Sequence, residues 1–479
     1  MGNSVYNRES RFSVEHLHVL IDGVNEDAVA LAQHLSRRGK RVTVLHTEYG
    51  DPENARRALR AEGGNVDFRL RTEIANIGEA GTLFVSPSTP SHDVIIDHAR
   101  AKGFTISSLA DTVLRDAPGG TVGVTGSAGK TTTTFLLSAI LRNAGFDVIG
   151  STDYRLTPSG PGKAMLEAVT SLNDASWAVV ELTSHHLSYV TTSPSIGVVT
   201  NLFPDHQDWH GSFEAYRSAK QNLLRFQQSG DVAVLNFDDP EVRGHFHGLG
   251  RGRNFYFSAM DKIANGIVVA DGHIALRSRG GCHKICAVSE LRMPRHHIPN
   301  ALAAAAVAIE LGVKTETLRD ALVIFQGLPQ RCQFLGIRDG IEIYDDTIGM
   351  NPRKALNGLE TFPDQSLVVV SGGAVQSVGG EKRVNSALEM GDLRLFCEAL
   401  LRKATSVVLF DEGGDIIERT LAETGGMMPP VVRAKNFEAA VLEAIGAAHP
   451  GARLLISPVF YNPPLDVRRF LEHLVSKSG

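Results

Sequence analysis

The chain has 479 residues, of which 43% are hydrophobic and 21% are charged, which is ordinary for a globular protein with sizeable cores. Its net charge of −5 gives no electrostatic reason to expect a nucleic acid or an acidic membrane as a partner. No apolar run is as long as a membrane span, and four cysteines in so long a chain indicate a reducing compartment, so we expect a cytoplasmic protein. The length of the chain suggests three domains of ordinary size.

The first predicted domain comprises residues 1–116. It opens with a strand, a turn, an amphipathic helix and a second strand over HLHVLIDGVNEDAVALAQHLSRRGKRVTVLHT, and further strands are expected at TLFVS and GFTIS. The turn contains Asp22, Glu26 and Asp27. Three carboxylates near a helix N-terminus either cap the helix or repel a phosphate group bound there.

The segment TVGVTGSAGKTTTT, residues 121–134, predicts a binding site for ATP or GTP. A β-branched strand leads into a glycine-rich turn and then into a helix, so that backbone N–H groups and the helix dipole can bind phosphates. Lys130 would reach the β- and γ-phosphates, and the Thr131 hydroxyl would hold Mg²⁺. Val124 stands where the common phosphate loop has its first glycine. The residues expected to bind the nucleotide here are Gly126, Ser127, Ala128, Gly129, Lys130, Thr131 and Thr132.

The rest of the second predicted domain, residues 117–326, continues with parallel strands at WAVVEL, IGVVTNLF and VAVLNF. Residues 253–290 alternate and contain glycines, so we expect a small antiparallel insertion there. Helices at HHIPNALAAAAVAIELGV and TETLRDALVIF close the domain.

Polar residues gather at the predicted strand ends of this domain. Glu181 directly follows a strand, where an acid can hold the Mg²⁺ of a nucleotide, although a solvated carboxylate is the simpler interpretation. The segment NLFPDHQDWHG, residues 201–211, has two acids and two histidines within six residues, which suggests a second metal or phosphate site. Lys220 follows on a helix, where a lysine is usually solvated.

The third predicted domain comprises residues 327–479, with strands at IEIYDD, SLVVVSGG, SVVLF and RLLISP. Repeated β–α units predict doubly wound sheets that bind ligands at the carboxyl ends of their strands. Arg331 and Asp346 could close over a nucleotide from this side, although each indication is weak by itself.

The order of motifs resembles the Mur ligase family. GVTGSAGKT, ELTS, NLFPDHQDWHGSFEAYRSAK, HHIPNALAAAA, LPQR and YDDT follow one another over nearly the whole chain. The most similar branch adds glutamate to UDP-N-acetylmuramoyl-L-alanine in peptidoglycan synthesis. The resemblance implies a Rossmann-like N-terminal domain for the UDP-substrate, a central ATPase domain and a Rossmann-like C-terminal domain for the amino acid. It also implies that ATP phosphorylates a carboxylate to give an acyl phosphate, and that the amine of the amino acid then attacks this acyl phosphate.

The resemblance assigns further roles to particular residues. It implies Glu181 and His206 as ligands of two Mg²⁺ ions, His206 lying in the D-H-x-D motif, and Lys220 as a lysine that is carbamylated and helps to position the second ion. Arg331 and Asp346 match residues that contact the nucleotide when the domains close. His297 stands where an asparagine near the adenine is usual.

The third domain departs from the pattern of this branch. Ile348 and Met350 replace a lysine and a threonine that help to hold glutamate, and Gln376 replaces a further lysine. The segment SPVFYNPPLD, residues 457–466, replaces a serine-bearing segment that contacts the side-chain carboxylate of the amino acid. Burying the side-chain carboxylate of glutamate without these partners would be costly, so we expect the pocket for the amino acid to differ from that of this branch.

We therefore expect a monomeric ATP-dependent ligase that joins an amino acid, D- or L-glutamate first, to a UDP-muramoyl type of carboxylate. One alternative is a Mur-like ligase of a specialised pathway with a non-UDP substrate or another amino acid. A phosphate-loop switch or motor ATPase and a non-catalytic nucleotide-binding regulator are the other classes. The D-H-x-D motif disfavours the former, and the presence of Lys130, Thr131, Glu181 and His206 disfavours the latter.

Overall fold

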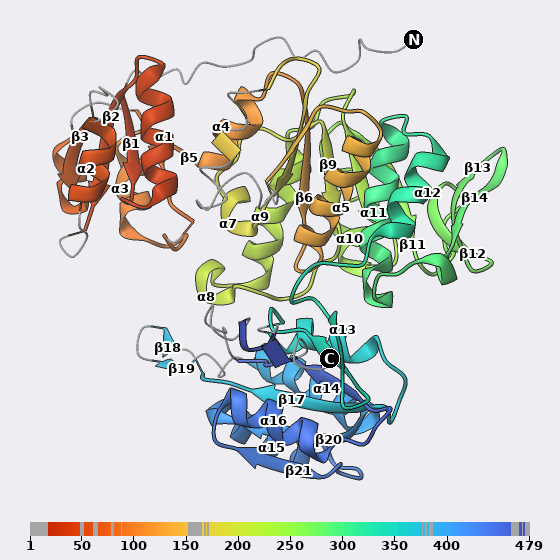
Figure 1. The fold of residues 1–479 in the computed structure, drawn as a ribbon. Coiled ribbons are helices and arrows are strands. Elements are labelled where there is room, and N and C mark those ends of the chain that lie inside the picture. The colour runs from red at the N-terminus through yellow and green to blue at the C-terminus, as the bar shows by residue number, and fades with distance from the viewer. Residues whose placement is uncertain are drawn as a thin grey trace. The chain divides into compact units, whose positions relative to one another are not determined.

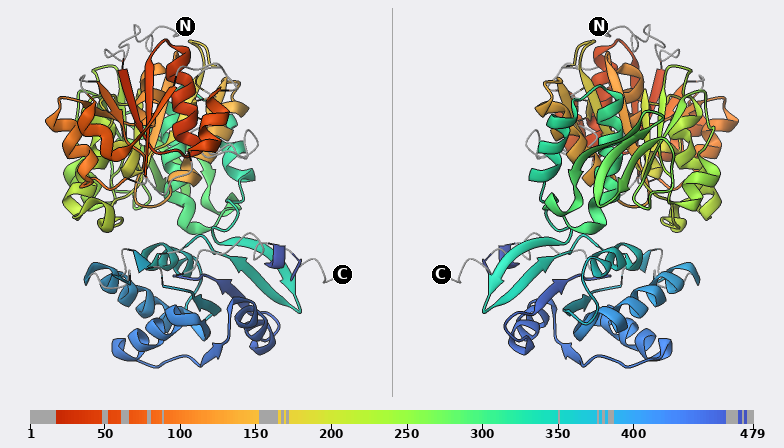
Figure 2. Two further views of the ribbon diagram at one scale, coloured as in Figure 1. Left: turned by 90° about the vertical axis from the view of Figure 1, so that its left-hand side faces the viewer. Right: turned by 90° about the vertical axis from the view of Figure 1, so that its right-hand side faces the viewer.

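The protein forms two compact units in the computed structural model, one of residues 1–291 and 299–325 and the other of residues 292–298 and 326–479 (Figures 1 and 2). The structure describes residues 18–47, 52–60, 66–77, 81–87, 89–151, 165–166, 169, 172–349, 351–375, 377–378, 381–382, 387–460, 469–471 and 473–474. Each of the three large sheets lies within one of the three predicted domain ranges. The predicted α/β class with mostly parallel sheets is confirmed.

The first sheet has five parallel strands in the order β3-β2-β1-β4-β5. Successive side chains of β1 point to opposite faces, so Val19 and Ile21 pack with the cluster that contains helices α1 and α4, whereas Leu20 packs with α3. The elements are β1 (His18–Asp22), α1 (Glu26–Arg37), β2 (Arg41–His46), α2 (Glu53–Arg60), β3 (Val66–Leu70), η1 (Arg71–Asn76), β4 (Thr82–Phe84), α3 (Val94–Ala101), β5 (Thr105–Ser107) and α4 (Leu109–Asp116).

The second sheet has nine strands in the order β14-β13-β12-β11-β10-β9-β6-β8-β7. Its strands are β6 (Gly120–Thr125), β7 (Val148–Gly150), β8 (Trp177–Glu181), β9 (Ile196–Val199), β10 (Val232–Asn236), β11 (Arg253–Ser258), β12 (Gly266–Ala270), β13 (His273–Ser278) and β14 (Gly281–Ala287). Its helices are α5 (Lys130–Asn143), α7 (Ser184–Leu187), α8 (Gln207–His210), α9 (Phe213–Arg225), α10 (Pro240–His245), η2 (Val288–Glu290), α11 (Ile298–Glu310) and α12 (Thr315–Ile324).

The prediction of an antiparallel insertion at residues 253–290 was partly wrong. β11 pairs parallel with β10, and β12 pairs parallel with β11, so the main sheet continues through both strands. Only β12, β13 and β14 form the expected antiparallel meander. An alternating half-buried strand has the same sequence pattern in either orientation, so the pattern could not set the direction of pairing.

The third sheet has six strands in the order β15-β16-β22-β17-β20-β21, and all neighbours are parallel except β15 and β16. Val369 of β17 packs with α13, α14 and α15 on one face, whereas Val368 and Val370 pack with α16 on the other. The elements of this unit are η3 (Arg295–His297), β15 (Gln333–Arg338), β16 (Ile341–Asp345), α13 (Pro352–Glu360), β17 (Leu367–Gly372), β18 (Ser377–Val378), β19 (Glu381–Lys382), α14 (Ala387–Lys403), β20 (Ala404–Phe410), α15 (Asp411–Thr424), β21 (Val431–Ala434), α16 (Phe437–Ala447) and β22 (Arg453–Ile456).

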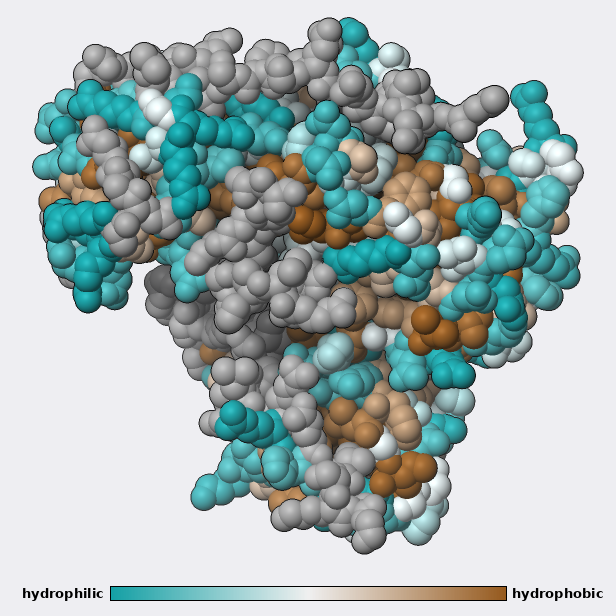
Figure 3. Space-filling view, turned by 45° about the horizontal axis from the view of Figure 1, so that its top comes forward, coloured by the Kyte–Doolittle hydropathy of each residue, from teal (hydrophilic) through white to brown (hydrophobic). Residues whose placement is uncertain are grey.

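The surface is mixed in polarity. On the face drawn in Figure 3, hydrophilic residues predominate and the hydrophobic ones form several separate patches. Scattered apolar groups of this kind are normal on a protein surface. Among the residues that the structure describes, no helix is both long enough and apolar enough to cross a bilayer.

Candidate active site

The predicted phosphate loop lies at the point where the strand order of the second sheet reverses. β6 is flanked by β8 and β9, and the loop joins the carboxyl end of β6 to the N-terminus of α5. Gly126 and Gly129 have φ angles of 153° and 84°. A Cβ atom at Gly126 would lie 2.0 Å from Thr200 Oγ1, and one at Gly129 would lie 2.2 Å from Asn300 Oδ1. Both positions therefore require glycine, for backbone conformation and for space.

Residues that follow β9 hold the loop in place. Asn201 accepts a hydrogen bond from Ala128 N at 2.8 Å and donates one to Ala128 O at 3.1 Å. Thr200 Oγ1 donates to the same carbonyl at 2.6 Å, and Ser127 Oγ donates to Phe203 O at 2.8 Å. The first helical hydrogen bond of α5 runs from Thr133 N to Gly129 O, so the N–H groups of the preceding residues lie in the orientation that binds phosphate.

Two lysine side chains converge on the carbonyl oxygen of Gly126. Lys130 Nζ donates to it at 3.0 Å, and Lys220 Nζ donates to it at 2.9 Å. Lys220 is only 1% exposed, also donates to Thr125 Oγ1 at 3.2 Å, and lies 4.8 Å from the centre of the Tyr216 ring. These contacts offset part of the cost of burying an ammonium group. The structure thus concentrates positive charge beside the phosphate loop.

The other predicted residues of this unit lie at the neighbouring strand ends. Glu181 ends β8 and is half-buried, and its N–H donates to Ser151 Oγ at 2.8 Å. His206 precedes α8 with a left-handed φ of 52°, and its side chain is 40% exposed. Thr132 is completely buried, and its hydroxyl makes no hydrogen bond within the described part of the chain, so the prediction that Thr132 contacts the nucleotide does not fit this structure.

An aromatic cluster surrounds His206. The His185 ring from α7 lies edge-on to the rings of His206 and Trp209, at centroid distances of 4.7 and 4.8 Å. The His210 ring contacts Trp209 and Tyr216. Burial, together with the neighbouring imidazoles and Lys220, lowers the pKa of His185 to about 3. His185 is therefore neutral at physiological pH and adds no charge beside His206.

The structure places the remaining predicted residues in the second unit. His297 is buried in η3, and burial lowers its pKa to about 4. Asp346 is also buried, and its carboxylate accepts hydrogen bonds from Ser457 Oγ at 2.8 Å and from Cys332 N at 3.1 Å. Arg331 directly precedes Cys332, so Asp346 fixes the backbone next to this arginine. The predicted residues thus form two groups, one in each unit.

The structure describes only some of the residues of the predicted acceptor pocket. Ile348 is 37% exposed at the carboxyl end of the β16 region. Met350, Gln376 and residues 461–466 lie outside the described residues. The described part of the segment 457–466 includes Ser457, whose hydroxyl binds Asp346.

The acidic turn of the first domain differs from both sequence-based interpretations. Asp22 is 3% exposed and forms a bidentate pair with Arg71, at 2.8 and 3.1 Å, and accepts a hydrogen bond from Thr89 at 2.6 Å. The cap of α1 is Asn25, which accepts from Ala28 N at 2.9 Å, and not one of the acids. Asp22 is therefore neutralised, and the turn repels an anion less than its sequence indicated.

Sequence reasoning missed several residues that shape the site. Tyr216 lies four residues before Lys220, so helical spacing could have placed it on the same face. Asn201 lies in the segment 201–211, already noted for its polar residues, and His185 directly follows the motif ELTS. Thr200 and Asn300 gave no signal, because each meets the phosphate loop from about 70 residues or more along the chain.

Comparison with known proteins agrees with this geometry. The profile of the Mur ligase middle domain matches residues 124–308. A UDP-N-acetylmuramoylalanine–D-glutamate ligase of Symbiobacterium thermophilum is 30% identical over 439 residues and covers 91% of each chain. An enzyme of the same name from Acidobacterium capsulatum is 30% identical over 456 residues, with 92% of this chain and 91% of the other covered.

Solved structures share the fold. A pseudomurein peptide ligase type C from Methanothermus fervidus has a TM-score of 0.57 at 16% identity, with 96% of this chain and 100% of the other covered. MurF ligase from Thermotoga maritima in complex with ADP has a TM-score of 0.57 at 17% identity, with 85% and 97% covered.

Fold and phosphate loop together define an α/β enzyme that uses a nucleoside triphosphate. The chain belongs to the Mur ligase family, and it is an ATP-dependent ligase that forms an amide bond.

Replacing Gly129 by alanine should abolish tight ATP binding. The added Cβ atom would collide with Asn300 Oδ1 while the residue keeps φ at 84°, so we expect the ATP affinity of Gly129→Ala to fall at least about tenfold. Gly145→Ala is the matched control, because Gly145 has a φ of 86° but no atom within 4 Å of the added Cβ. Calorimetric titration with ATP measures both. Equal affinities in the two variants would contradict this account of the loop.

Asp346 should make the second unit less stable as pH rises. Burial, aided by Asp345, raises the pKa of Asp346 to about 7 against the hydrogen bonds from Ser457 and Cys332 and the charge of Arg331. The folded state then keeps a proton that the unfolded chain releases near pH 4, about its ordinary pKa, so the free energy of unfolding falls between about pH 4 and 7. Asp346→Asn should remove this contribution. Denaturant titrations of both proteins across this range measure it, and parallel pH profiles would contradict it.

Proposed function

We propose that this enzyme joins glutamate, D or L, to UDP-N-acetylmuramoyl-L-alanine in peptidoglycan synthesis. The substrate carboxylate attacks the γ-phosphorus of ATP, ADP leaves, and an acyl phosphate forms. The amine nitrogen of the amino acid then attacks the acyl carbon, phosphate leaves, and the nitrogen loses a proton to give the amide. Relatives with this printed activity cover more than 90% of the chain, which supports the proposal.

The observation that carries the chemistry is the convergence of Lys130 and Lys220 on the Gly126 carbonyl. A carboxylate that attacks a phosphate brings two anions together, so the site must offset negative charge in the transition state. Lys130 can supply this charge to the β- and γ-phosphates. On the resemblance, Lys220 is carbamylated, and its carboxylate would then help to hold a Mg²⁺ ion, which would supply the second positive charge beside Lys130.

Mg²⁺ fits the oxygen and nitrogen donors of this site. Among the described residues, no group of three or more His, Cys, Asp or Glu side chains could hold a metal ion by itself. Such a donor-poor site suits Mg²⁺, which usually takes one or two protein ligands, waters and substrate phosphates. We propose Thr131 and Glu181 for one ion and His206 with carbamylated Lys220 for a second. The ions would supply charge neutralisation at the phosphates.

We propose a separate role for each of the three domains. Residues 1–116 would bind the UDP-substrate at the carboxyl ends of β1 and β4, where the strand order reverses. Residues 117–326 would bind ATP. His297, within residues 117–326, would lie near the adenine. Residues 327–479 would bind the amino acid and supply Arg331 and Asp346 as contacts to the nucleotide. A monomer in the cytoplasm, where ATP is available, belongs to the same proposal.

Phosphate release from ATP tests the proposed function. The protein is supplied with Mg²⁺, UDP-N-acetylmuramoyl-L-alanine and each amino acid in turn, and the product mass is measured. We expect release to require both substrates and to yield the amide with D- or L-glutamate. Release with no amino acid, or with a different carboxylate only, would contradict this choice of substrates.

Loss of Lys130 or His206 should stop amide formation. Lys130→Ala removes a cation from the β- and γ-phosphates, and His206→Ala removes a proposed ligand of the second Mg²⁺ ion. We expect each substitution to lower kcat by about 10²- to 10³-fold. The exposed Lys262→Ala and His283→Ala serve as matched controls and should keep wild-type kcat. Steady-state phosphate release measures all four. Full activity of Lys130→Ala or His206→Ala would overturn the role of that residue.

Restoring positive charge to the acceptor pocket should improve the use of glutamate. We expect the double substitution Ile348→Lys and Gln376→Lys to lower KM for glutamate, since a side-chain carboxylate gains cationic partners. Ile337→Lys, at a second exposed isoleucine of the same unit, is the control and should leave KM unchanged. An unchanged KM in the double variant would count against the altered pocket.

A further inference from the structure

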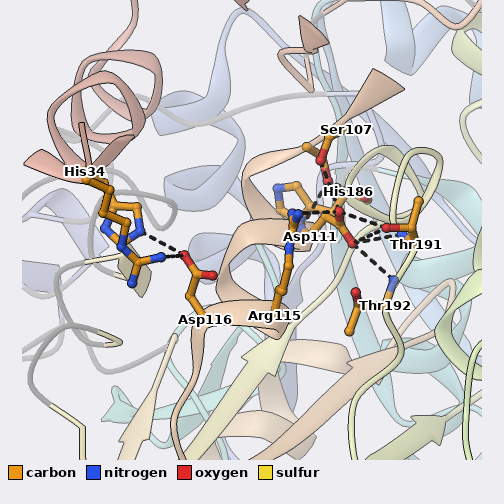
Figure 4. Close-up of polar contacts among 10 residues, drawn as sticks. His34, Ser107, Asp111, Arg115, Asp116, His186, Thr191 and Thr192 are labelled. Atoms are coloured by element: carbon orange, nitrogen blue, oxygen red, sulfur yellow. Dashed lines mark hydrogen bonds and ion pairs between the residues drawn. The ribbon is translucent and has the colours of Figure 1, made fainter. Parts of the chain in front are cut away.

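Helix α4 connects the first sheet to the second, and its two aspartates contact partners on different sides of the helix (Figure 4). Asp116, at its last turn, binds His34 at 3.0 Å and also Arg38, and both partners belong to the first domain. Asp111, in the first turn of the helix, faces the loop that leads into β9. α4 is therefore bonded to both domains at once.

Asp111 accepts an unusually complete set of hydrogen bonds for a buried carboxylate. It is 1% exposed and accepts from Thr191 N at 2.8 Å, Thr192 N at 3.1 Å and the Thr191 hydroxyl at 3.1 Å. On the side of the first domain it accepts from the Ser107 hydroxyl at 3.1 Å, and Arg115 pairs with it at 3.0 Å. Charge-assisted bonds of this kind fix geometry strongly.

The neighbouring Ser108 holds the other end of the same central-domain segment. Its hydroxyl donates to His186 O in α7 at 3.1 Å, while it caps α4 by accepting from Asp111 N at 3.3 Å. The N-terminus of α4 therefore holds both α7 and the residues 191–192 that follow it.

This segment adjoins the proposed catalytic residues. It starts directly after Glu181, and α7 positions His185 edge-on against His206. Asn222, on the same helix as Lys220, donates to Leu187 O at 2.9 Å. The phosphate loop itself is held by Thr200, Asn201 and Asn300, which Asp111 does not contact.

We infer that Asp111 is a positioning residue, which fixes the first domain and its bound acyl substrate in place relative to the segment 182–192. This inference rests on the proposed function. The reacting carboxylate must stand about 3–3.5 Å from the γ-phosphorus, and a misplacement of about 1 Å can cost about 10²-fold in rate. Asp111 affects the alignment of the acyl substrate and leaves the ATP site intact.

The test compares Asp111→Asn with Asp116→Asn, two equal changes on one helix. For Asp111→Asn we expect kcat/KM for the acyl substrate to fall at least about tenfold while the ATP dissociation constant stays within about twofold of wild type. Asp116→Asn should change neither, because α4 stays joined to the first domain through β5, which directly precedes it, and through the hydrogen bond from Ser107 to Asp111. Equal losses in both variants, a parallel loss of ATP affinity, or wild-type kcat/KM in Asp111→Asn would each overturn the inference.

A milder pair covers the case in which Asp111→Asn fails to fold. Thr191→Val removes only the hydroxyl donor and should lower kcat/KM, and Thr191→Ser should restore it. No loss in Thr191→Val would overturn the inference if Asp111→Asn is unfolded.

Amide hydrogen exchange of residues 184–192 separates this inference from the proposed function. Faster exchange in Asp111→Asn than in Asp116→Asn is expected whether or not the muramoyl substrate is turned over. Unchanged exchange overturns the inference, whereas a wild-type protein that makes no amide overturns only the proposed substrate.

Discussion

The close packing of the phosphate loop against the residues after β9 is the constraint on which the site depends. Gly126 and Gly129 adopt backbone angles that favour glycine and leave no room for a Cβ atom beside Thr200 and Asn300. The loop is therefore shaped before any nucleotide binds. Its Gly126 carbonyl then serves as the point where the side chains of Lys130 and Lys220 meet, so loop shape and charge placement have one structural cause.

Other polar groups of the first unit serve the same geometry. The Tyr216 ring contacts Lys220, and its hydroxyl shares a hydrogen bond of 2.9 Å with Ser127, so helix α9 reaches the loop directly. Burial keeps His185 neutral, so that this ring adds no positive charge beside His206. Asp111 connects the first domain to residues 191–192, and Ser108 connects it to α7. A ligase that uses three substrates needs its binding sites held in fixed positions, because the reacting atoms come from different molecules.

The fold and the nucleotide loop were predictable from sequence, because strand–turn–helix patterns and the residues 126–131 are local in the chain. Features that depend on distant contacts were not. The lysine at 220 looks solvated on its helix and becomes buried only when α9 packs, so the family resemblance was needed to select it. The partner that offsets the charge of Asp22 is Arg71, which is 49 residues away. The parallel pairing of β11 depends on β10, and its own alternation could not reveal it.

Oxygen-18 transfer is the most direct test of the central claim that the site neutralises a carboxylate attacking ATP. The acyl substrate is labelled with oxygen-18 in its carboxylate, and the phosphate released during amide formation is analysed by mass. Attack through an acyl phosphate predicts that one labelled oxygen appears in the released phosphate. Phosphate without label, formed together with the amide, would contradict the account.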